Sequence, residues 1–172
     1  MNIFYKENQT NAKRNTLDEK SSNQTFKLSP LDKKVLSLLL SNARLSYRQI
    51  ARKTKTSVAT VIQHIRNLES KGVIKYYTAV LDHEKIGYEI SAIIEIVVSK
   101  GKLTKVEEEI AKHKNVCAVY DVTGLTDAIV IAKFKSRKEL SEFVKSLLAM
   151  EYIERTNTHL ILNTVKEDFR LL

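Results

Sequence analysis

The sequence lacks the paired cysteines that a disulfide framework would need. Its single cysteine, Cys117, lies in the apolar run 116–122, where a lone thiol is typical of a buried structural residue. We therefore expect Cys117 to be buried and unpaired, as in a reducing cytoplasm. No apolar stretch reaches the length of a membrane span, and residues 1–16 lack the apolar core of a signal peptide. These absences predict a soluble, cytoplasmic protein.

Motifs for catalysis and metal binding are also missing. The sequence has no glycine-rich phosphate loop, no nucleophile motif and no cysteine cluster. The acidic run 107–109 has the pattern of a solvated helix face. The four histidines lie far apart, without the spacing of metal ligands: His64, His83, His113 and His159. We therefore expect a protein that is not an enzyme and that has neither a cofactor nor a metal.

Positive charge is present in excess and is concentrated in one third of the chain. The formal net charge is +9. Residues 29–80 carry ten Lys and Arg against two Asp and Glu, whereas residues 81–172 carry fourteen against fifteen. A concentrated basic block favours an anionic partner, most often nucleic acid, because Lys and Arg near phosphates release condensed counterions. A solvated charged surface is the alternative, and it suits the near-neutral second half better.

The N-terminal leader, residues 1–27, is rich in Asn, Gln, Thr, Ser and Lys and has few apolar side chains. Such a segment cannot bury enough apolar surface to offset its ordering entropy, so we predict that it is mostly disordered. A solubilising tail and a weakly basic arm on DNA are the two interpretations of its role.

The next segment predicts three short helices, each begun by a serine. Ser29, Ser46 and Ser57 are the expected N-caps, and Gly72 should end the third helix. With the short break at 55–56, these helices make a helix-turn-helix. Apolar residues recur at helical spacing and should face inward: Leu31, Val35, Leu38 and Leu39 in the first helix, Tyr47, Ile50, Ala51 and Thr54 in the second, and Val58, Val61, Ile62, Ile65 and Leu68 in the third.

The second half of the chain alternates strands and helices. The order βαββαβ is the ferredoxin-like arrangement, so the expected fold class is α+β. We predict strands at 89–98, 116–123, 128–134 and 152–164, and helices at 103–114 and 137–149. The expected domains are the leader (1–27), the helix-turn-helix (28–74), a linker strand and turn (75–88) and the ferredoxin-like domain (89–172).

A four-stranded ferredoxin-like sheet carries helices on one face only. Ile94, Ile96, Val130 and Ala132 suggest that its other face is also partly apolar. Exposed apolar sheet usually marks an interface. We therefore predict an obligate dimer that forms through sheet packing.

The third predicted helix has an outer face suited to DNA. Thr60, Gln63, Asn67 and, less centrally, His64 point away from its apolar face, and no acidic residue lies among them. Gln and Asn can bond an adenine edge bidentately, and Thr can contact a thymine methyl. Basic side chains around this face suit phosphates. An ordinary solvated helix face is the alternative. The basic side chains are Arg48, Arg52, Lys53, Lys55, Arg66 and Lys71. The predicted DNA-contacting set is Arg48, Lys53, Lys55, Ser57, Thr60, Gln63, His64 and Arg66.

These residues resemble a known family. The stretches LSPLDKKVLSLLLSNARLSYRQIARKTKTS and TVIQHIRNLESKGVI are similar to the helix-turn-helix of the Lrp/AsnC transcription regulators. The downstream unit with VTGLTD resembles that family's amino-acid-binding and oligomerisation domain, and the resemblance covers about residues 28–168. It implies a sequence-specific regulator that binds palindromic half-sites of double-stranded DNA as a dimer, with tetramers or octamers beyond that, and that responds to an amino-acid effector.

Three departures from the family pattern involve four positions. Lys55 stands where the turn before the third helix usually has glycine. Gln63 and His64 stand where two adjacent arginines are common, which suggests a different operator sequence and weaker non-specific binding to DNA. Thr126 replaces an aromatic residue in the ligand loop, and the wider, more polar pocket favours a small or polar amino acid.

The loop 124–127, Gly-Leu-Thr-Asp, could bind an amino acid. Glycine permits a tight turn, exposed amides can hold a carboxylate, and Asp127 can hold an ammonium. A hairpin turn with a structural Asp is the alternative, and the family resemblance favours ligand binding. The predicted effector contacts are Thr123, Gly124, Leu125, Thr126, Asp127, Thr156 and Thr158.

Two further hypotheses belong to other classes of protein. An architectural protein that coats DNA without an effector would need the same basic block. Some haem-pathway decarboxylases look similar to this family in fold, but a catalytic relative would not need the positive charge of the helix-turn-helix.

Overall fold

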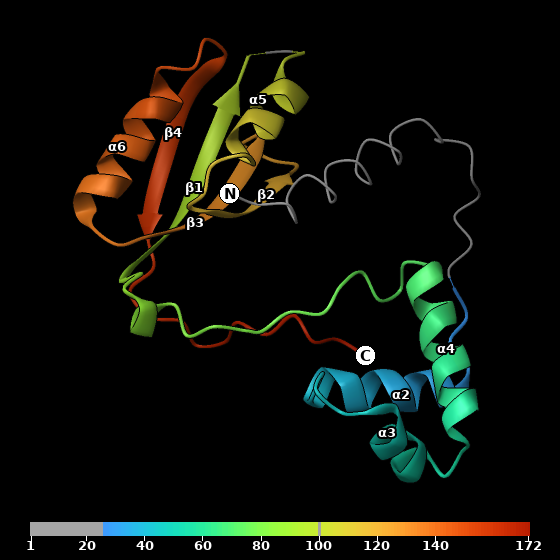
Figure 1. Cartoon of the computed structure of the whole chain (residues 1–172). Helices are drawn as coiled ribbons and strands as arrows, with labels where there is room; N and C mark the ends of the chain where they lie inside the picture. The colour runs from blue at the N-terminus through green and yellow to red at the C-terminus, as the bar shows by residue number, and fades with distance from the viewer. Residues whose placement is uncertain (1–25, 100) are drawn as a thin grey trace. The chain divides into compact units, whose positions relative to one another are not determined.

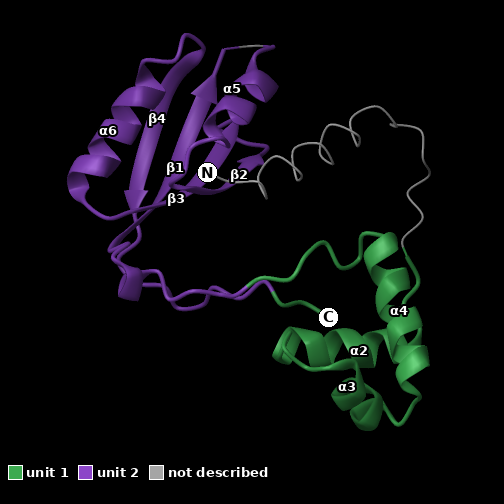
Figure 2. Cartoon of the chain, viewed as in Figure 1, with its two compact units in different colours: residues 1–78, 170–172 green, residues 79–169 purple. Residues whose placement is uncertain are grey.

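The computed structural model describes residues 26–99 and 101–172, so almost all of the predicted leader lies outside the described residues. The chain forms two compact units, and Figure 2 shows them in different colours. One contains the described residues up to Thr78 together with 170–172, and the other spans 79–169. The division between them falls within the predicted linker, 75–88.

The first unit contains three helices joined by short turns, as the sequence predicts (Figure 1). Each predicted serine cap is confirmed: its hydroxyl accepts a hydrogen bond from the backbone N–H three residues on. Such caps satisfy N–H groups that the first turn of a helix leaves unpaired. The helices are α2 (Pro30–Ser41), α3 (Tyr47–Thr54) and α4 (Val58–Ser70).

The core of this unit lies where the three helices meet. It is built from Val35, Leu39, Ile50, Ala51, Val61 and Ile65. Two predicted inward residues are exposed instead, Tyr47 at 45% and Val58 at 37%. Each is the first residue of its helix. A side chain there projects beyond the point where the other two helices pack, and helical periodicity by itself does not show this.

Lys55 forms the sharp turn between α3 and α4. Its φ of 56° and ψ of 43° place it in the left-handed region, and it is the one non-glycine residue with positive φ in 26–99 and 101–172. The amide of Thr56 donates to Ala51 O at 3.0 Å and closes the end of α3. This position favours glycine, because a Cβ there meets the following carbonyl at a cost of roughly 1–2 kcal/mol.

The second unit is a four-stranded antiparallel sheet with the order β2-β3-β1-β4. Both of its helices lie on one face in Figure 1, and the connection βαββαβ confirms the ferredoxin-like prediction. The elements are β1 (Ile90–Val98), α5 (Leu103–Ile110), β2 (Val116–Asp121), β3 (Ala128–Phe134), α6 (Arg137–Leu148) and β4 (Ile153–Leu160).

Some predicted boundaries differ from the structure. The segment 75–82 is not a strand, and a short 3-10 turn follows it, η1 (Glu84–Ile86). β4 ends at Leu160 rather than 164, because β1 begins at Ile90 and the chain beyond 161 runs past its partner. α5 ends at Ile110, where a series of turns leads into β2.

The assignment of residues to the two sheet faces was wrong. Ile94, Ile96, Val130 and Ala132 are fully buried in the core beneath α5 and α6, not on the open face. Side chains alternate along a strand, so a one-residue error in parity exchanges the two faces. The open face carries half-buried apolar residues of the other parity, Ile93, Val97, Ile129 and Ile131, with Ile93 directly opposite Ile131.

Cys117 is exposed, which contradicts the prediction of a buried thiol. It lies on β2, an edge strand of the sheet, where the register with β3 shifts between Val116 and Ala118. Such a bulge rotates the extra residue out of the regular alternation, so an apolar sequence neighbourhood did not bury this side chain.

Within residues 26–99 and 101–172, no helix is long and apolar enough to cross a membrane. The same residues contain no group of three or more His, Cys, Asp or Glu side chains placed to hold a metal ion.

Candidate DNA-reading face and ligand loop

The outer face of α4 presents polar side chains without any acidic group among them. Gln63 and Asn67 are exposed, and Thr60 is half-buried. The hydroxyl of Ser57 both caps the helix and lies 2.8 Å from the hydroxyl of Thr60. Ser57 and Thr60 therefore hold each other at the start of the helix, and the two amides stand free of the core for contacts outside the chain.

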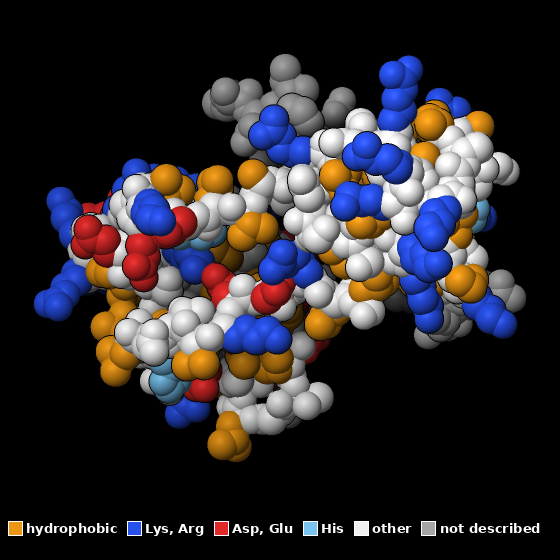
Figure 3. Space-filling view, turned by 90° about the horizontal axis from the view of Figure 1, so that it is seen from below, with side chains coloured by type: hydrophobic (Ala, Val, Ile, Leu, Met, Phe, Trp, Pro, Cys, Tyr) orange, Lys and Arg blue, Asp and Glu red, His pale blue; other side chains and the backbone are white. Residues whose placement is uncertain are grey.

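The predicted phosphate-contacting side chains are all exposed: Arg48, Arg52, Lys53, Lys55, Arg66 and Lys71. Of the two acidic residues in 26–78, Asp32 is buried. Glu69 is exposed and accepts a hydrogen bond from the hydroxyl of Tyr77 at 2.9 Å, so it is the one acidic group at the surface of this segment. Figure 3 shows Lys and Arg side chains gathered over this unit. The first unit thus offers an anionic polymer an almost wholly basic surface.

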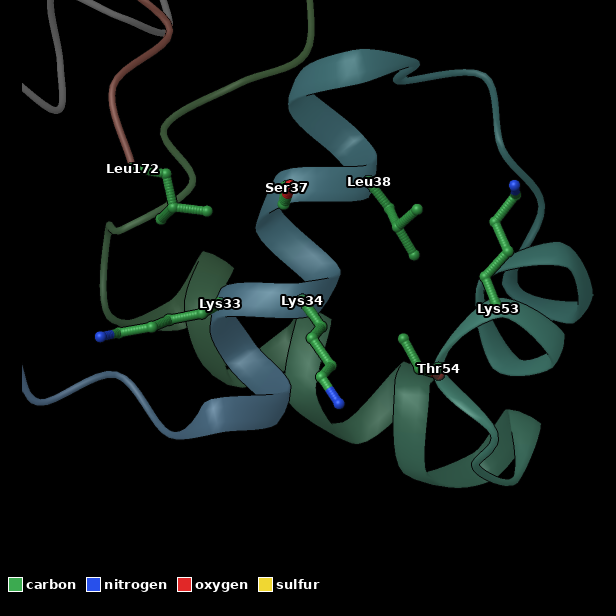
Figure 4. Close-up of a pocket in the computed structure, with 7 residues that line it drawn as sticks. All are labelled: Lys33, Lys34, Ser37, Leu38, Lys53, Thr54 and Leu172. Atoms are coloured by element: carbon green, nitrogen blue, oxygen red, sulfur yellow. The ribbon is translucent and has the colours of Figure 1, made fainter.

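Three lysines border a hollow on the same unit, with a volume of about 520 Å³. Lys33 and Lys34 come from α2 and Lys53 comes from α3 (Figure 4). The remaining lining residues are Ser37, Leu38, Thr54 and Leu172. The sequence singled out Lys53 but missed the two lysines of α2, because they lie in the first helix, away from the predicted reading face. Their charge suits contacts with phosphates.

The structure gives His64 a partner that the sequence did not predict. Its Nδ1 lies 2.7 Å from Oδ1 of Asp32, a residue of α2 with 4% exposure. The second oxygen of Asp32 accepts from the backbone N–H of Ser29 at 2.8 Å. His64 therefore stands at the edge of the outer face, attached to α2, rather than free like Gln63. Helical spacing cannot reveal a partner 32 residues away.

The ligand loop between β2 and β3 is tied to the end of β1. Gly124 has φ of 131°, and Leu125 is 96% exposed. The hydroxyl of Thr126 donates to Ile96 O at 2.7 Å, and Oδ2 of Asp127 accepts from the Val98 amide at 2.8 Å. The register between β1 and β4 shifts beside Val98, so Asp127 satisfies an amide at an irregular point of the sheet. This is the structural role that the sequence left as the alternative.

The two threonines of β4 lie on the helix-covered side of the sheet. Thr156 is opposite Ile96 and Thr158 is opposite Ile94. Thr156 is therefore one strand away from the loop residue Thr126, which bonds the same Ile96. The structure brings Thr156 close to the predicted loop, and Thr158 lies one pair further along β4.

A carboxylate that the sequence placed on a solvated helix face is partly buried beside this loop. Oε1 of Glu107 on α5 is buried and has no hydrogen-bond partner in the described parts of the chain. Burial raises the pKa of Glu107, and the neighbouring Asp121 carboxylate raises it further. Asp121 ends β2 and leads directly into the loop. Only packing of α5 on β2 brings these two carboxylates together, so the pattern Glu107-Glu108-Glu109 misled the sequence prediction.

Comparison with known proteins agrees with both units. A family model described as winged helix-turn-helix DNA-binding matches residues 28–75, and a model of the Lrp/AsnC ligand binding domain matches residues 91–171. An HTH-type transcriptional regulator of Pyrococcus furiosus is 50% identical over 146 residues, 85% of this chain and 99% of that protein. The HTH-type transcriptional regulator FL11 of Pyrococcus horikoshii is 33% identical over 84% of this chain and 95% of its own.

Solved structures share the fold. A transcriptional regulator of Neisseria meningitidis, determined as a complex with L-Met, superposes with a TM-score of 0.79 at 24% identity, over 85% of this chain and 97% of that one. A helix-turn-helix followed by a ligand-binding domain defines a DNA-binding transcription regulator. This chain belongs to the Lrp/AsnC family of such regulators.

Proposed function

We propose that this regulator reads palindromic half-sites as a dimer, with the outer face of α4 in the major groove. The observation that carries this proposal is the outer face itself, where Gln63 and Asn67 stand exposed among basic side chains. In this arrangement Thr60, Gln63 and His64 contact base edges. Arg48, Lys53, Lys55 and Arg66 contact phosphates, and Ser57 lies at the start of the helix, where phosphate contacts are common.

Two substitutions test this division of roles. Gln63→Ala should cost roughly 1–3 kcal/mol on the cognate site and relax specificity at one base pair. Lys53→Ala should weaken binding to all sequences alike and flatten its salt dependence. Both effects are measured by titrating selected and scrambled duplexes. Unchanged affinity and preference in Gln63→Ala would show that this face is not the reader.

We also propose an amino-acid-like effector at the loop between β2 and β3. Loop amides and the hydroxyls of Thr123, Thr126 and Thr156 would meet its polar groups, and Gly124 and Leu125 would let it approach the backbone. The complex of the Neisseria regulator with L-Met supports this class of ligand. A ligand that binds one assembly better than another would shift the equilibrium between assemblies, and with it the number of half-sites held together. Thr126 in place of an aromatic favours a small or polar amino acid.

The effector test uses a conservative variant of Asp127. Asp127→Asn keeps an oxygen that can accept from the Val98 amide but removes the charge that would hold an ammonium. Calorimetry with a panel of amino acids should show binding to the wild type and at least tenfold weaker binding to the variant. Undiminished binding to Asp127→Asn would place the ammonium elsewhere.

An effector-independent architectural role is the second candidate. One observation favours it: the side chains of Thr126 and Asp127 are already bonded to β1. Footprinting at several salt concentrations separates the two. A regulator protects defined half-sites, whereas a coating protein protects all DNA with a steep salt dependence.

A further inference from the structure

The recognition helix α4 is linked to α2 by a buried carboxylate. Oδ1 of Asp32 lies 2.7 Å from Nδ1 of His64, and Oδ2 accepts from the Ser29 amide at 2.8 Å. The hydroxyl of Ser29 in turn accepts from the Asp32 amide at 3.1 Å. Asp32 therefore forms part of the N-terminal cap of α2 and at the same time contacts His64 of α4.

The charge state of Asp32 determines which hydrogen-bond partners its carboxyl group can have. Burial raises the pKa of this carboxyl, but hydrogen bonds from Ser29 and His64 outweigh that effect and leave the pKa below its ordinary value. Asp32 is therefore ionised at neutral pH, and an ionised carboxylate only accepts hydrogen bonds. The imidazole nitrogen that faces it must carry a hydrogen. In a neutral ring the other nitrogen, Nε2, then keeps its lone pair.

Part of the His64 side chain is accessible beside the outer face. The side chain keeps 29% of its surface exposed although Nδ1 faces a buried oxygen. Thr60 and Asn67 lie four residues before and three after it, one turn away on the same side of the helix. Within residues 26–99 and 101–172, Asp32 is the charged side chain that contacts the ring.

We propose that Asp32 is a positioning residue for DNA recognition, which holds His64 with Nδ1–H inward so that Nε2 accepts a hydrogen bond from an adenine or cytosine amino group. These two bases supply the amino donors of the major groove, adenine at N6 and cytosine at N4, whereas guanine and thymine present acceptors. The assignment rests on the proposed reading role of α4. Beyond that role, it specifies that the Nε2 side of His64 faces the DNA, that Asp32 orients the ring, and that adenine or cytosine is selected.

The first experiment tests the positioning without DNA. Nitrogen-15 NMR of the histidine rings, recorded across a pH series, distinguishes the two neutral tautomers from each other and from the imidazolium form. In the wild type we expect His64 to carry its hydrogen on Nδ1. In Asp32→Asn the new amide can accept from Nδ1–H or donate to a bare Nδ1, so we expect a mixture of tautomers. A wild-type ring with its hydrogen on Nε2, or an unchanged tautomer in Asp32→Asn, would overturn the positioning role.

The second experiment tests base selection with a variant that keeps the link to α2. In His64→Asn the side-chain amide can replace Nδ1–H toward Asp32, but nothing occupies the place of Nε2. Selection from random double-stranded DNA should give the wild type an adenine or cytosine preference at one position of each half-site. His64→Asn should lose that preference by on the order of tenfold while its melting temperature stays near that of the wild type.

The possible outcomes distinguish a failure of the roles assigned to His64 and Asp32 from a failure of the proposed reading role of α4. If the wild type selects no sequence, the proposed reading role of α4 fails. If the wild type selects a site and a folded His64→Asn selects the same one, reading by α4 stands and the role of His64 is overturned. If Asp32→Asn does not fold, the wild-type tautomer and the His64→Asn selection still decide the matter.

Discussion

Lys55 shows how a single residue can set stability against function. It holds a left-handed conformation at the end of α3, where a side chain is disfavoured, and the residue is exposed in the turn before α4. Strained positions of this kind are often kept where the side chain has a use. A phosphate contact by Lys55 would be such a use.

Lys55→Gly should therefore stabilise the helix-turn-helix by about 1 kcal/mol and weaken DNA binding regardless of sequence. Lys53→Gly is the matched control, because the same change inside α3 should destabilise by about 1 kcal/mol. Urea unfolding of both variants gives the comparison. A less stable Lys55→Gly would mean that the lysine makes contacts that outweigh the strain.

The ionisation of Tyr77 reports on the structure at the end of α4. Burial and the hydrogen bond to the Glu69 carboxylate raise the pKa of Tyr77 to about 12, from an ordinary 10.0. Because the folded pKa is the higher one, this contact contributes to stability below about pH 10 and is lost as the pH rises through about 12. The tyrosinate absorbance of wild type minus Tyr77→Phe should titrate near 12, and Glu69→Gln should lower that value. A difference that titrates near 10 would show that the hydrogen bond is not formed in solution.

At the scale of the element, packing changes the chemistry of side chains that look alike in the sequence. Glu107 and Glu108 are neighbours on α5, yet Glu107 turns one oxygen into a buried site near Asp121 while Glu108 is exposed. The raised pKa of Glu107 means that its charged form is disfavoured in the folded state. The folded state therefore loses stability as the pH rises through that pKa.

Glu107→Gln removes this charge, so it should raise the stability at neutral pH by on the order of 1 kcal/mol. The gain should shrink as the pH falls toward about 4, where the wild-type carboxyl is protonated as well. Thermal melts across this pH range make the measurement, with Glu108→Gln as the exposed control that should change little. Equal effects of the two variants would contradict the buried position of Glu107.

At the scale of the whole molecule, the open sheet face is the surface through which we predict that two copies pack. Ile93, Val97, Ile129 and Ile131 form a mostly apolar stripe, interrupted by Glu95, on the face that α5 and α6 leave uncovered. Covering this stripe with a second copy would remove it from water, and the two helix-turn-helix units could then engage two half-sites.

Ile131→Lys should therefore convert a dimer at micromolar concentration into a monomer, as measured by light scattering, because a charge would be buried in the proposed interface. Leu148→Lys is the control: this exposed residue of α6 lies on the helix side of the sheet and should leave the dimer intact. A wild-type monomer, or a dimer that survives Ile131→Lys, would rule out packing through this face.

What the sequence by itself determined is local in origin. The three serine caps and the turn at Lys55 were predicted at the residues where the structure has them, because a cap is decided by side chains within three or four positions of the helix start. The strand and helix order of the second unit followed from apolar periods, which also repeat locally. The reading face of α4 and the ligand loop were proposed on the same basis.

Only the tertiary structure decided what depends on partners far apart in the chain. The pairing of His64 with Asp32, the attachment of Asp127 to Val98, the burial of Glu107 and the exposure of Cys117 all arise where separate elements meet. The face of the sheet on which each strand residue lies is also decided at this level, because it depends on the register across the whole sheet. Local pattern specifies which elements form, whereas the contacts that orient functional side chains come from long-range packing, which no short window of sequence contains.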